Sequence, residues 1–482
     1  MKIKRIQLEN NVFFGNTTFD FVDDNGQIMD NIILAGENGS GKTQLLNLIY
    51  EFSMLSLSGI VRNEKRKFTV VLSDEELSQL MSNIDSAMMP ESLTGEFEIT
   101  QDYIVQPNYW NRIKVNYWFI NENGASSKES IDASHLFANA NVKKIFKSVF
   151  STVEINYNSQ PTSTITAQEV DQELEDSIRS SDNLGTEIQQ LFIDIYTNDA
   201  MDLKNWVIEH KNMVPPAEIN SIRIDRFKNA FSTIFNNLNF CKISTENNVK
   251  KAIFKKDNAE IDIGSLSSGE KQIVFRGAFL LRNQQSIKGN IVLIDEPEIS
   301  LHPKWQEKIF EYYRKLFVDE NGKQTSQMFI ATHSQYVLDA ALSENDAVIF
   351  LMRRLENNTI EMKKIRTSLL VLPSVTVAEL NYVAFDVLSN DYHIELYGYL
   401  QQKIALSQGT EECSIVGCDE YIKQQPEYNS ELHGKESSYK RTQYFTLPTY
   451  IRNAIDHPAP DKIITKEQLR CSIELLIELC RR

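Results

Sequence analysis

The amino-acid sequence predicts an α/β fold that carries a short helical insertion and ends in a mainly α-helical C-terminal domain. Two apolar strands, "NIILA" and "NIVLI", each run into a polar loop and then into a helix. Alternating strands and helices are typical of a parallel sheet covered by helices. The 482 residues are 41% hydrophobic, which is enough apolar material for about two to four packed domains.

We expect four segments along the chain. An N-terminal lobe over 1–150 contains the first strand–loop–helix unit, and a C-terminal lobe over 236–370 contains the second. Between them, 151–235 is rich in Glu, Gln and Ser with apolar residues at helical spacing, which predicts a helical insertion too short for long coiled-coil arms. Residues 371–482 form the separate helical domain.

Individual stretches predict the elements in order. "KIKRIQL" alternates apolar and basic residues and suits an edge strand, while "KFTVVL", "GEFEIT" and "IKVNYWFI" predict further strands. In the insertion, we expect "TAQEVDQELEDSIRSSDNLGTEIQQLFIDIY" to be helical, with a second helical stretch after Pro215 and Pro216. Near the end of the second lobe, "DAVIFLMRR" and "TIEMKKI" predict a closing hairpin.

The overall composition excludes several classes of protein. No apolar run reaches the roughly 18 residues of a membrane helix, and the first residues lack the apolar core of a secretory signal. Five scattered cysteines without paired spacing predict reduced thiols in the cytoplasm rather than a zinc site. The net charge of −16 does not favour nucleic-acid binding, although a local basic patch would permit it.

The loop "GENGSGKT" at residues 36–43 fulfils the complete G-x-x-x-x-G-K-T pattern of a P-loop. Its glycines let backbone N–H groups turn toward phosphates, and the following helix adds the positive end of its dipole. The lysine is expected to reach the β- and γ-phosphates of ATP, and the threonine to hold Mg²⁺. The alternative is a Gly-rich turn that only precedes a helix. The expected nucleotide-binding residues are Asn38, Gly39, Gly41, Lys42 and Thr43.

Two adjacent carboxylates, Asp295 and Glu296, stand at the end of the second buried strand. Asp295 is expected to hold the Mg²⁺ through water, and Glu296 to polarise the attacking water. An acidic strand end that faces solvent is the alternative interpretation.

Two further segments complete the predicted site. In "LSSGEKQ", Ser268 and Gly269 begin a helix whose N-terminus is either offered to a phosphate or only capped. His333 in "FIATHS" stands at another strand end, where it is either an ordinary histidine or a sensor of the γ-phosphate.

Together these motifs resemble ABC-type ATPases in the wider sense, which includes SMC-, repair- and OLD-like proteins. The resemblance covers roughly residues 1–370 and is carried by the P-loop, "LSSGE", "LIDEPE" and "ATHS" in the order of that family. It implies an ABC-type P-loop ATPase that forms an ATP-dependent homodimer, and it also permits higher oligomers. In it, Ser268 and Gly269 contact the γ-phosphate held by Lys42 of the other copy. It also implies a Q-loop glutamine, for which Gln101 is preferred over Gln106.

The C-terminal segment resembles HEPN-type ribonucleases through Arg452 and His457, which fit the R-x(4–6)-H pattern of that family. The resemblance implies that Arg452 stabilises a pentacovalent phosphate and that His457 either acts as the base or orients the 2′-OH. The alternative is a helical domain in which both side chains serve packing or docking.

The whole layout also resembles the ATPase subunits of the Septu and retron anti-phage systems, with "LNYVAF", "HIELYGYL" and "LPTYIRNAIDHP" as the C-terminal part of the match. That family implies an HNH-type nuclease partner. We therefore expect an ATPase that controls a nuclease acting in trans. The alternatives are a self-contained, ATP-gated ribonuclease and an SMC-like ATPase that clamps DNA without a nuclease.

Overall fold

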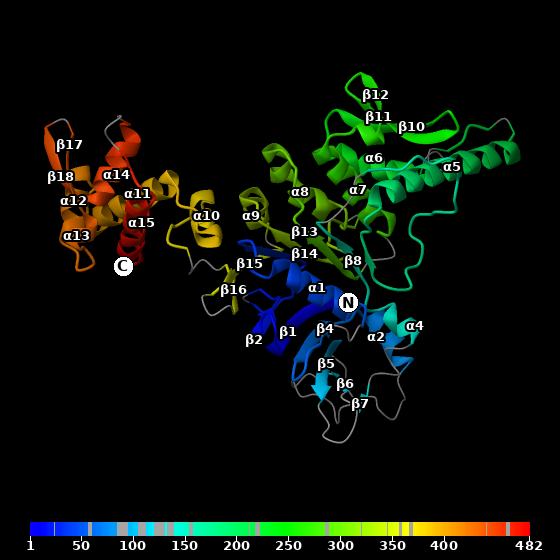
Figure 1. Ribbon diagram of the computed structural model, residues 1–482, viewed down its shortest axis with the longest axis horizontal. Helices are drawn as coiled ribbons and strands as arrows, with labels where there is room; N and C mark the ends of the chain where they lie inside the picture. Colours follow the sequence, from blue (N-terminus) through cyan, green and yellow to red (C-terminus); the bar gives the residue numbers. More distant parts are fainter. Residues whose placement is uncertain are drawn as a thin grey trace. The chain divides into compact units, whose positions relative to one another are not determined.

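The computed structural model describes most of the chain, and Figure 1 shows it as a ribbon. The described residues form two compact units, Met1–Lys363 and Lys364–Arg482. The sequence placed the start of the C-terminal domain at residue 371, whereas the division between the units falls at the end of strand β16. The described ranges are 1–23, 25–55, 60–83, 95–104, 112–119, 131–132, 139–153, 158–211, 213–216, 222–284, 289–319, 321–344, 346–355, 359–365, 370–439, 441–458 and 463–482.

A seven-stranded sheet forms the centre of the first unit, in the order β16-β15-β3-β14-β13-β8-β9. The strands from β15 to β9 all pair in parallel. Every residue of β3, β13 and β14 is buried, as expected for parallel strands covered on both faces. The strands are β3 Asn31–Gly36, β8 Ser148–Ser151, β9 Ile178–Arg179, β13 Ile291–Asp295, β14 Gln327–Thr332, β15 Ala347–Arg354 and β16 Ile360–Lys364.

A second, six-stranded sheet is antiparallel, in the order β2-β1-β4-β5-β6-β7. The predicted edge strand β1 pairs with β2 on one side and β4 on the other, so that prediction is wrong. Its alternating apolar residues pack into the core on one face, a pattern that a strand with two neighbours shares with an edge strand. The strands are β1 Lys2–Asn11, β2 Gly15–Asp20, β4 Lys65–Val71, β5 Glu96–Ile104, β6 Arg112–Phe119 and β7 Ile131–Asp132.

Helix α1 (Lys42–Ser53) joins the two sheets into one core. Its apolar side is buried in a cluster that includes residues from β1, β3, β4, β13 and β14. Phe52 of this helix stacks on Phe68 of β4 with ring centroids 3.8 Å apart. Two short helices, α2 (Asp74–Met81) and α4 (Ala140–Lys143), lie in the same part of the chain. The P-loop helix is thus anchored on both sides.

The insertion is helical only in its second half. Helices α5 (Leu184–Glu209) and α6 (Ile222–Ser232) are present, but 166–183 contains β9 and no helix, so the longer predicted helix is wrong in that part. The reason is tertiary, because this stretch follows the edge of the parallel sheet. Ile178 pairs with Val149 of β8, and the carboxylate of Asp194 on α5 accepts bonds from the backbone N–H groups of Thr166 and Gln168.

The second lobe supplies the remaining elements of the first unit. Figure 1 shows the parallel sheet in the middle of this unit, with the antiparallel sheet on one side and α5, α6 and β10–β12 on the other. These elements are β10 Leu238–Glu246, β11 Val249–Lys256, β12 Ala259–Asp262, the 3₁₀ helix η3 Ile263–Ser265, α7 Ser268–Arg282, α8 Pro303–Lys315 and α9 Gln335–Leu342.

The second unit is mainly helical, as the sequence predicts, and also contains a two-stranded hairpin. Its core is an apolar cluster drawn chiefly from α11 and α15, with further residues from α12 and α14. The elements are α10 Val377–Phe385, α11 Asn390–Gln408, α12 Ile415–Lys423, α13 Ser430–His433, β17 Gly434–Tyr439, β18 Thr442–Thr446, α14 Leu447–Asp456 and α15 Lys466–Arg481.

Candidate nucleotide-binding and hydrolysis site

The Gly-rich loop connects β3 to α1, and close packing explains two of its glycines. Gly36 has a φ of 152°, and a Cβ there would lie 2.1 Å from the carbonyl oxygen of Met352. Gly41, the N-cap of α1, has a φ of 95°, and a Cβ would lie 2.4 Å from the side chain of Ile360. A side chain at either position would force the loop away from β15 and β16. The loop therefore presents its backbone at the N-terminus of α1, where anions bind favourably.

Lys42 is folded across this loop. Its ammonium donates to the carbonyl oxygens of Gly36 and Glu37, at 2.9 Å and 3.0 Å. The side chain is buried, and burial lowers the pKa of Lys42 to about 8, although the carboxylates of Glu296 and Asp295 oppose this shift. The ammonium is thus held inside the loop, where it is able to meet a bound phosphate.

Thr43 and Asp295 come together from the two strand–loop–helix units. The Thr43 hydroxyl donates to Oδ2 of Asp295 over 2.9 Å, and the carboxylate is almost fully buried. Burial raises the pKa of Asp295 to about 6, and the bond from Thr43 opposes that shift. Among the described residues, Oδ1 of Asp295 has no hydrogen-bond partner. The pair therefore has an unsatisfied oxygen available for a ligand.

This oxygen pair fits Mg²⁺. Mg²⁺ takes hard oxygen ligands and keeps several waters, so one carboxylate, one hydroxyl and substrate phosphates suffice. Within the described ranges, no group of three or more His, Cys, Asp or Glu side chains is placed to hold a metal. All five cysteines are free thiols.

Glu296 and His333 face each other across the end of the sheet. Glu296 Oε1 lies 3.3 Å from Nε2 of His333, and both side chains are about three-quarters buried. Burial, followed by the positive charge of Lys42, lowers the pKa of His333. Glu296 has a φ of 45°, which is unusual for a residue other than glycine. The strained backbone therefore directs this carboxylate toward the histidine.

A third carboxylate, Glu298, holds the histidine segment in place, and the sequence analysis missed it. Its Oε1 accepts from the Thr332 hydroxyl at 2.8 Å and from the backbone N–H of His333 at 2.6 Å. Burial raises the pKa of Glu298. The signal was present, because a second acidic residue follows Pro297 in "DEPE". Only the fold shows that it points toward the strand end of β14.

The "LSSGE" segment begins helix α7, as predicted. Ser267 is the N-cap, and it forms a reciprocal capping box with Glu270. Lys256 of β11 forms an ion pair with Glu270 at 2.7 Å. Ser268 is exposed at the first turn, so the capped N-terminus of the helix is accessible from outside.

The predicted Q-loop glutamines are not resolved by the geometry. Gln101 is buried in β5 and lies opposite Arg66 of β4 in the sheet register. Gln106 lies outside the described residues. Gln101 therefore stays a prediction.

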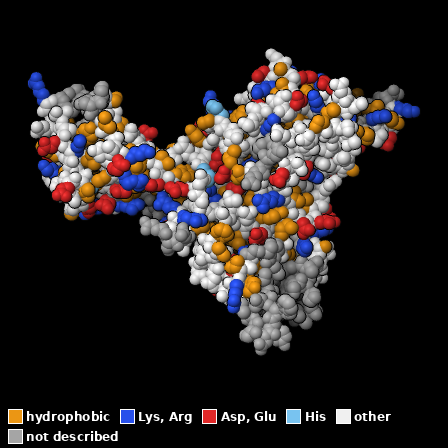
Figure 2. All heavy atoms as spheres, viewed as in Figure 1, with side chains coloured by type: hydrophobic (Ala, Val, Ile, Leu, Met, Phe, Trp, Pro, Cys, Tyr) orange, Lys and Arg blue, Asp and Glu red, His pale blue; other side chains and the backbone are white. Residues whose placement is uncertain are grey.

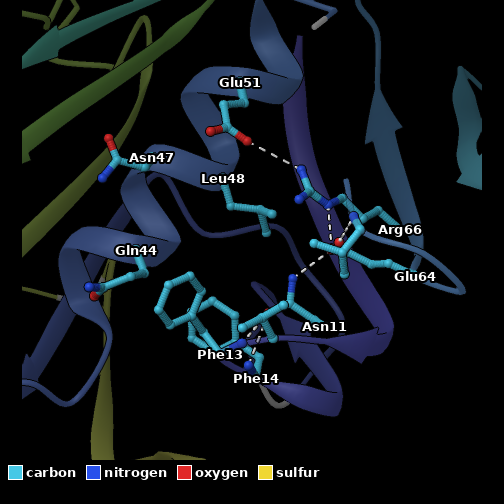
Figure 3. Close-up of a pocket in the computed structure, with 11 residues that line it drawn as sticks. Asn11, Phe13, Phe14, Gln44, Asn47, Leu48, Glu51, Glu64 and Arg66 are labelled. Atoms are coloured by element: carbon cyan, nitrogen blue, oxygen red, sulfur yellow. Dashed lines mark hydrogen bonds and ion pairs between the residues drawn. The ribbon is translucent and has the colours of Figure 1, made fainter. Parts of the chain in front are cut away.

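A cavity of about 540 Å³, which no pattern in the sequence predicts, adjoins the P-loop helix. Figure 3 shows the rings of Phe13 and Phe14 beside the face of α1 that carries Gln44. Phe14 also touches the P-loop, since a Cβ on Gly41 would lie 3.2 Å from its ring. The polar end of the cavity is rigid, because buried Glu64 accepts from both Asn11 and Arg66. The lining residues are Asn11, Val12, Phe13, Phe14, Gln44, Asn47, Leu48, Glu51, Val61, Glu64 and Arg66.

Arg452 and His457 lie at the C-terminal end of α14, in the second unit. The Arg452 guanidinium forms an ion pair with Asp456 at 2.7 Å and donates to Asn453 at 3.0 Å. His457 is the exposed C-cap residue of this helix. A helix C-terminus and a carboxylate both oppose an approaching phosphate. On the face drawn in Figure 2, acidic and basic side chains of this unit are intermixed. The ribonuclease site stays a prediction that these contacts do not favour.

The fold and the site define a P-loop α/β protein with an acidic second motif. Residues 1–338 match the family model described as an AAA ATPase domain. The chain belongs to this family of AAA ATPase domains. Within the described ranges, none of the helices combines the length and the apolar character needed to cross a membrane.

Relatives with known names agree with this family. The Retron Vc95 probable ATPase of Vibrio cholerae serotype O1 biovar El Tor is 22% identical over 358 residues, which is 72% of this chain and 63% of that protein. The Septu protein PtuA of Bacillus thuringiensis is 26% identical over 156 residues, 29% of this chain and 37% of that protein. The matches thus span less than two thirds of either relative. The solved SMC head domain from Thermotoga maritima has a TM-score of 0.39 and 12% identity, over 76% of this chain and 100% of that one.

Proposed function

We propose that the protein binds and hydrolyses ATP as an ABC-type ATPase, dimerises around ATP, and controls a partner nuclease in anti-phage defence. The observation that carries the ATPase part is the convergence of five side chains. Thr43 bonds to Asp295, and Glu296 faces His333, with the ammonium of Lys42 close enough to act on both carboxylates. P-loop ATPases need this combination of a phosphate cradle, a metal carboxylate and a base for water.

In the proposed reaction, Glu296 accepts a proton from the water that attacks the γ-phosphorus of ATP, and ADP leaves. Lys42 neutralises charge on the β- and γ-phosphate oxygens, and Thr43 and Asp295 would hold Mg²⁺. When bound, Mg²⁺ would supply further positive charge to the transferring phosphoryl group. His333 orients the carboxylate of Glu296 and is placed to meet the γ-phosphate.

We also propose that the cavity beside α1 receives the base of the nucleotide. It lies beside α1, the helix that begins at the end of the P-loop, and its volume is in the range of small-ligand sites. Phe13 offers an exposed ring, while the buried Phe14 fixes the segment through an edge-to-face contact with Phe19 at 5.3 Å. A flat exposed ring beside a phosphate site is suited to stack on a purine.

Replacing Phe13 by Ala is expected to weaken ATP binding by about tenfold, because base–aromatic stacking is worth roughly 1–3 kcal/mol. The dissociation constant of ATP, measured by calorimetry, checks this. Phe445→Ala removes another partly exposed ring, in the second unit, and serves as the control. Equal affinities for ATP in the two variants would refute the base site but leave the phosphate site untouched.

The nuclease part of the proposal is supported by the similarity to retron and Septu proteins. The partner is expected to be of HNH type and to dock on the second unit. Co-purification of the chain with its gene neighbours, followed by nuclease assays with and without ATP, tests this. A complex that cuts DNA or RNA identically with wild-type protein and with Lys42→Ala would contradict control by the ATPase. RNA cleavage by the chain alone, lost in His457→Ala, would instead support the self-contained ribonuclease.

A further inference from the structure

Two buried side chains of helix α7 hold the backbone that follows β13. Nη1 of Arg276 donates to the carbonyl oxygen of Asp295 at 2.8 Å and to that of Glu296 at 3.3 Å. One helical turn earlier, Nε2 of Gln272 donates to the carbonyl oxygen of Pro297 at 2.8 Å. Both side chains are about 1% exposed. The helix therefore bonds to three consecutive carbonyl groups: those of the predicted metal ligand Asp295, the predicted base Glu296 and the following Pro297.

Arg276 also joins a third element to this contact. Its Nη2 donates to the carbonyl oxygen of Thr152, just after β8, at 2.8 Å. Burying a guanidinium is costly unless its donors are satisfied, and an apolar side chain would pack a helix without that cost. What the planar, multi-donor guanidinium adds is a fixed position for several carbonyl groups at once.

The bonds from α7 act on Glu296, whose backbone conformation is strained. A φ of 45° is unfavourable for Glu296, because its Cβ crowds the backbone in this conformation. Three bonds hold the residue there: its N–H donates to the carbonyl of Ala331 at 2.9 Å, and its own carbonyl accepts from Arg276 at 3.3 Å and from the N–H of Ile299 at 3.4 Å. This backbone conformation determines the direction of the carboxylate toward His333. Arg276 and Gln272 thus act on the carboxylate through its backbone.

At its N-terminus, the same helix also contacts the segment that follows these three carbonyl groups. A Cβ at Gly269 would lie 2.8 Å from the carbonyl oxygen of Ser300 and 3.2 Å from the ring of Trp305. Gly269 is one of the two residues expected to meet the partner's nucleotide, and Ser268 beside it is exposed. Helix α7 therefore meets the segment 295–300 at three points, through Gly269, Gln272 and Arg276.

We infer that Gln272 and Arg276 are positioning residues for ATP hydrolysis, which link the "LSSGE" end of α7 to the catalytic carboxylate of the same chain. The inference rests on the proposed function. When Ser268 and Gly269 of one chain engage the nucleotide held by a second copy, the contact acts on a helix that is bonded to the backbone of Glu296 in the first chain. Closure of the dimer on one ATP thereby aligns the base for the other.

The test replaces Gln272 by Met, which keeps the length and apolar stem of the side chain and removes its donor. The lost bond is the one to Pro297, since Oε1 of Gln272 has no partner among the described residues. Gln284→Met is the matched control, because Nε2 of Gln284 donates to the carbonyl of Leu316, beyond the C-terminus of the same helix. We expect kcat for ATP hydrolysis to fall about tenfold in Gln272→Met and to stay unchanged in Gln284→Met.

A role in positioning and a role in folding give different results. In the first case the dissociation constant of ATP and the melting temperature of Gln272→Met match those of the control, and only kcat falls. Arg276→Lys provides a second variant, in which one ammonium cannot serve the carbonyls of Asp295, Glu296 and Thr152 together, and the same selective loss is expected. A kcat equal to wild type in Gln272→Met, or a joint loss of kcat, affinity and melting temperature in both variants, would overturn the inference. Wild-type protein that hydrolyses no ATP would overturn the proposed function as well, so the two failures are distinguishable.

Discussion

We expect Glu296→Gln to lower the rate of ATP hydrolysis by about 10²- to 10⁴-fold, the usual contribution of a positioned general base. The amide is nearly the same size as the carboxylate and can still contact His333, which lies 3.3 Å from Glu296. It cannot accept a proton from the attacking water. ATP binding is therefore expected to stay intact, since the contacts of Lys42 and Thr43 do not involve this side chain.

A turnover assay and a binding assay on the same preparation check this result. Because hydrolysis is blocked after binding, the variant should also accumulate as an ATP-bound dimer in size-exclusion chromatography with light scattering. Glu307→Gln, on the exposed side of α8, is the control for the loss of one negative charge. Turnover in Glu296→Gln equal to that of the control would show that another group acts as the base.

The sequence was sufficient for the parts of the site that depend on local patterns. The P-loop and the "LIDEPE" carboxylates each lie in one continuous stretch, so strand periodicity and glycine spacing predicted their place in the fold. The same holds for the capping box of Ser267 and Glu270, which needs a spacing of only three residues.

What the sequence could not show depends on contacts between distant segments. Gln272 and Arg276 look like ordinary helix residues until α7 is packed beside the end of β13. The cavity beside α1 requires the β1–β2 turn and the segment before β4 to meet, about 50 residues apart in the chain. The two wrong predictions, of β1 as an edge strand and of a helix over 166–183, have the same origin. Strand β1 pairs with a second strand, and residues 166–183 follow the edge of the parallel sheet. Tertiary pairing overrides local propensity in such places.

We expect ATP turnover to reappear when two variants of this protein, each inactive alone, are mixed. Lys42→Ala removes the ammonium that is held inside the P-loop, and Ser268→Arg places a bulky cation at the exposed first turn of α7. We expect each variant alone to lose ATP turnover. The first cannot bind ATP firmly, and the second binds it but cannot close on a second copy.

A mixed dimer, however, keeps one complete site, made from the P-loop of the Ser268→Arg chain and the intact α7 N-terminus of the Lys42→Ala chain. Random pairing makes half of the dimers mixed, each with one of two sites intact, which limits the mixture to about a quarter of wild-type turnover. Because α7 of the Ser268→Arg chain engages no nucleotide in this dimer, the alignment of its own Glu296 is lost, and turnover is expected to fall about tenfold below that limit. Enzyme assays across mixing ratios check this, and a mixture of Lys42→Ala with Glu296→Gln is the control, because neither site of that mixed dimer has both a lysine and a base in the same chain. If the first mixture stays as inactive as its components, the shared-site geometry is refuted even where the Glu296 result stands. Turnover by Ser268→Arg alone equal to wild type would refute it too, because each chain would then hydrolyse ATP without a partner's α7.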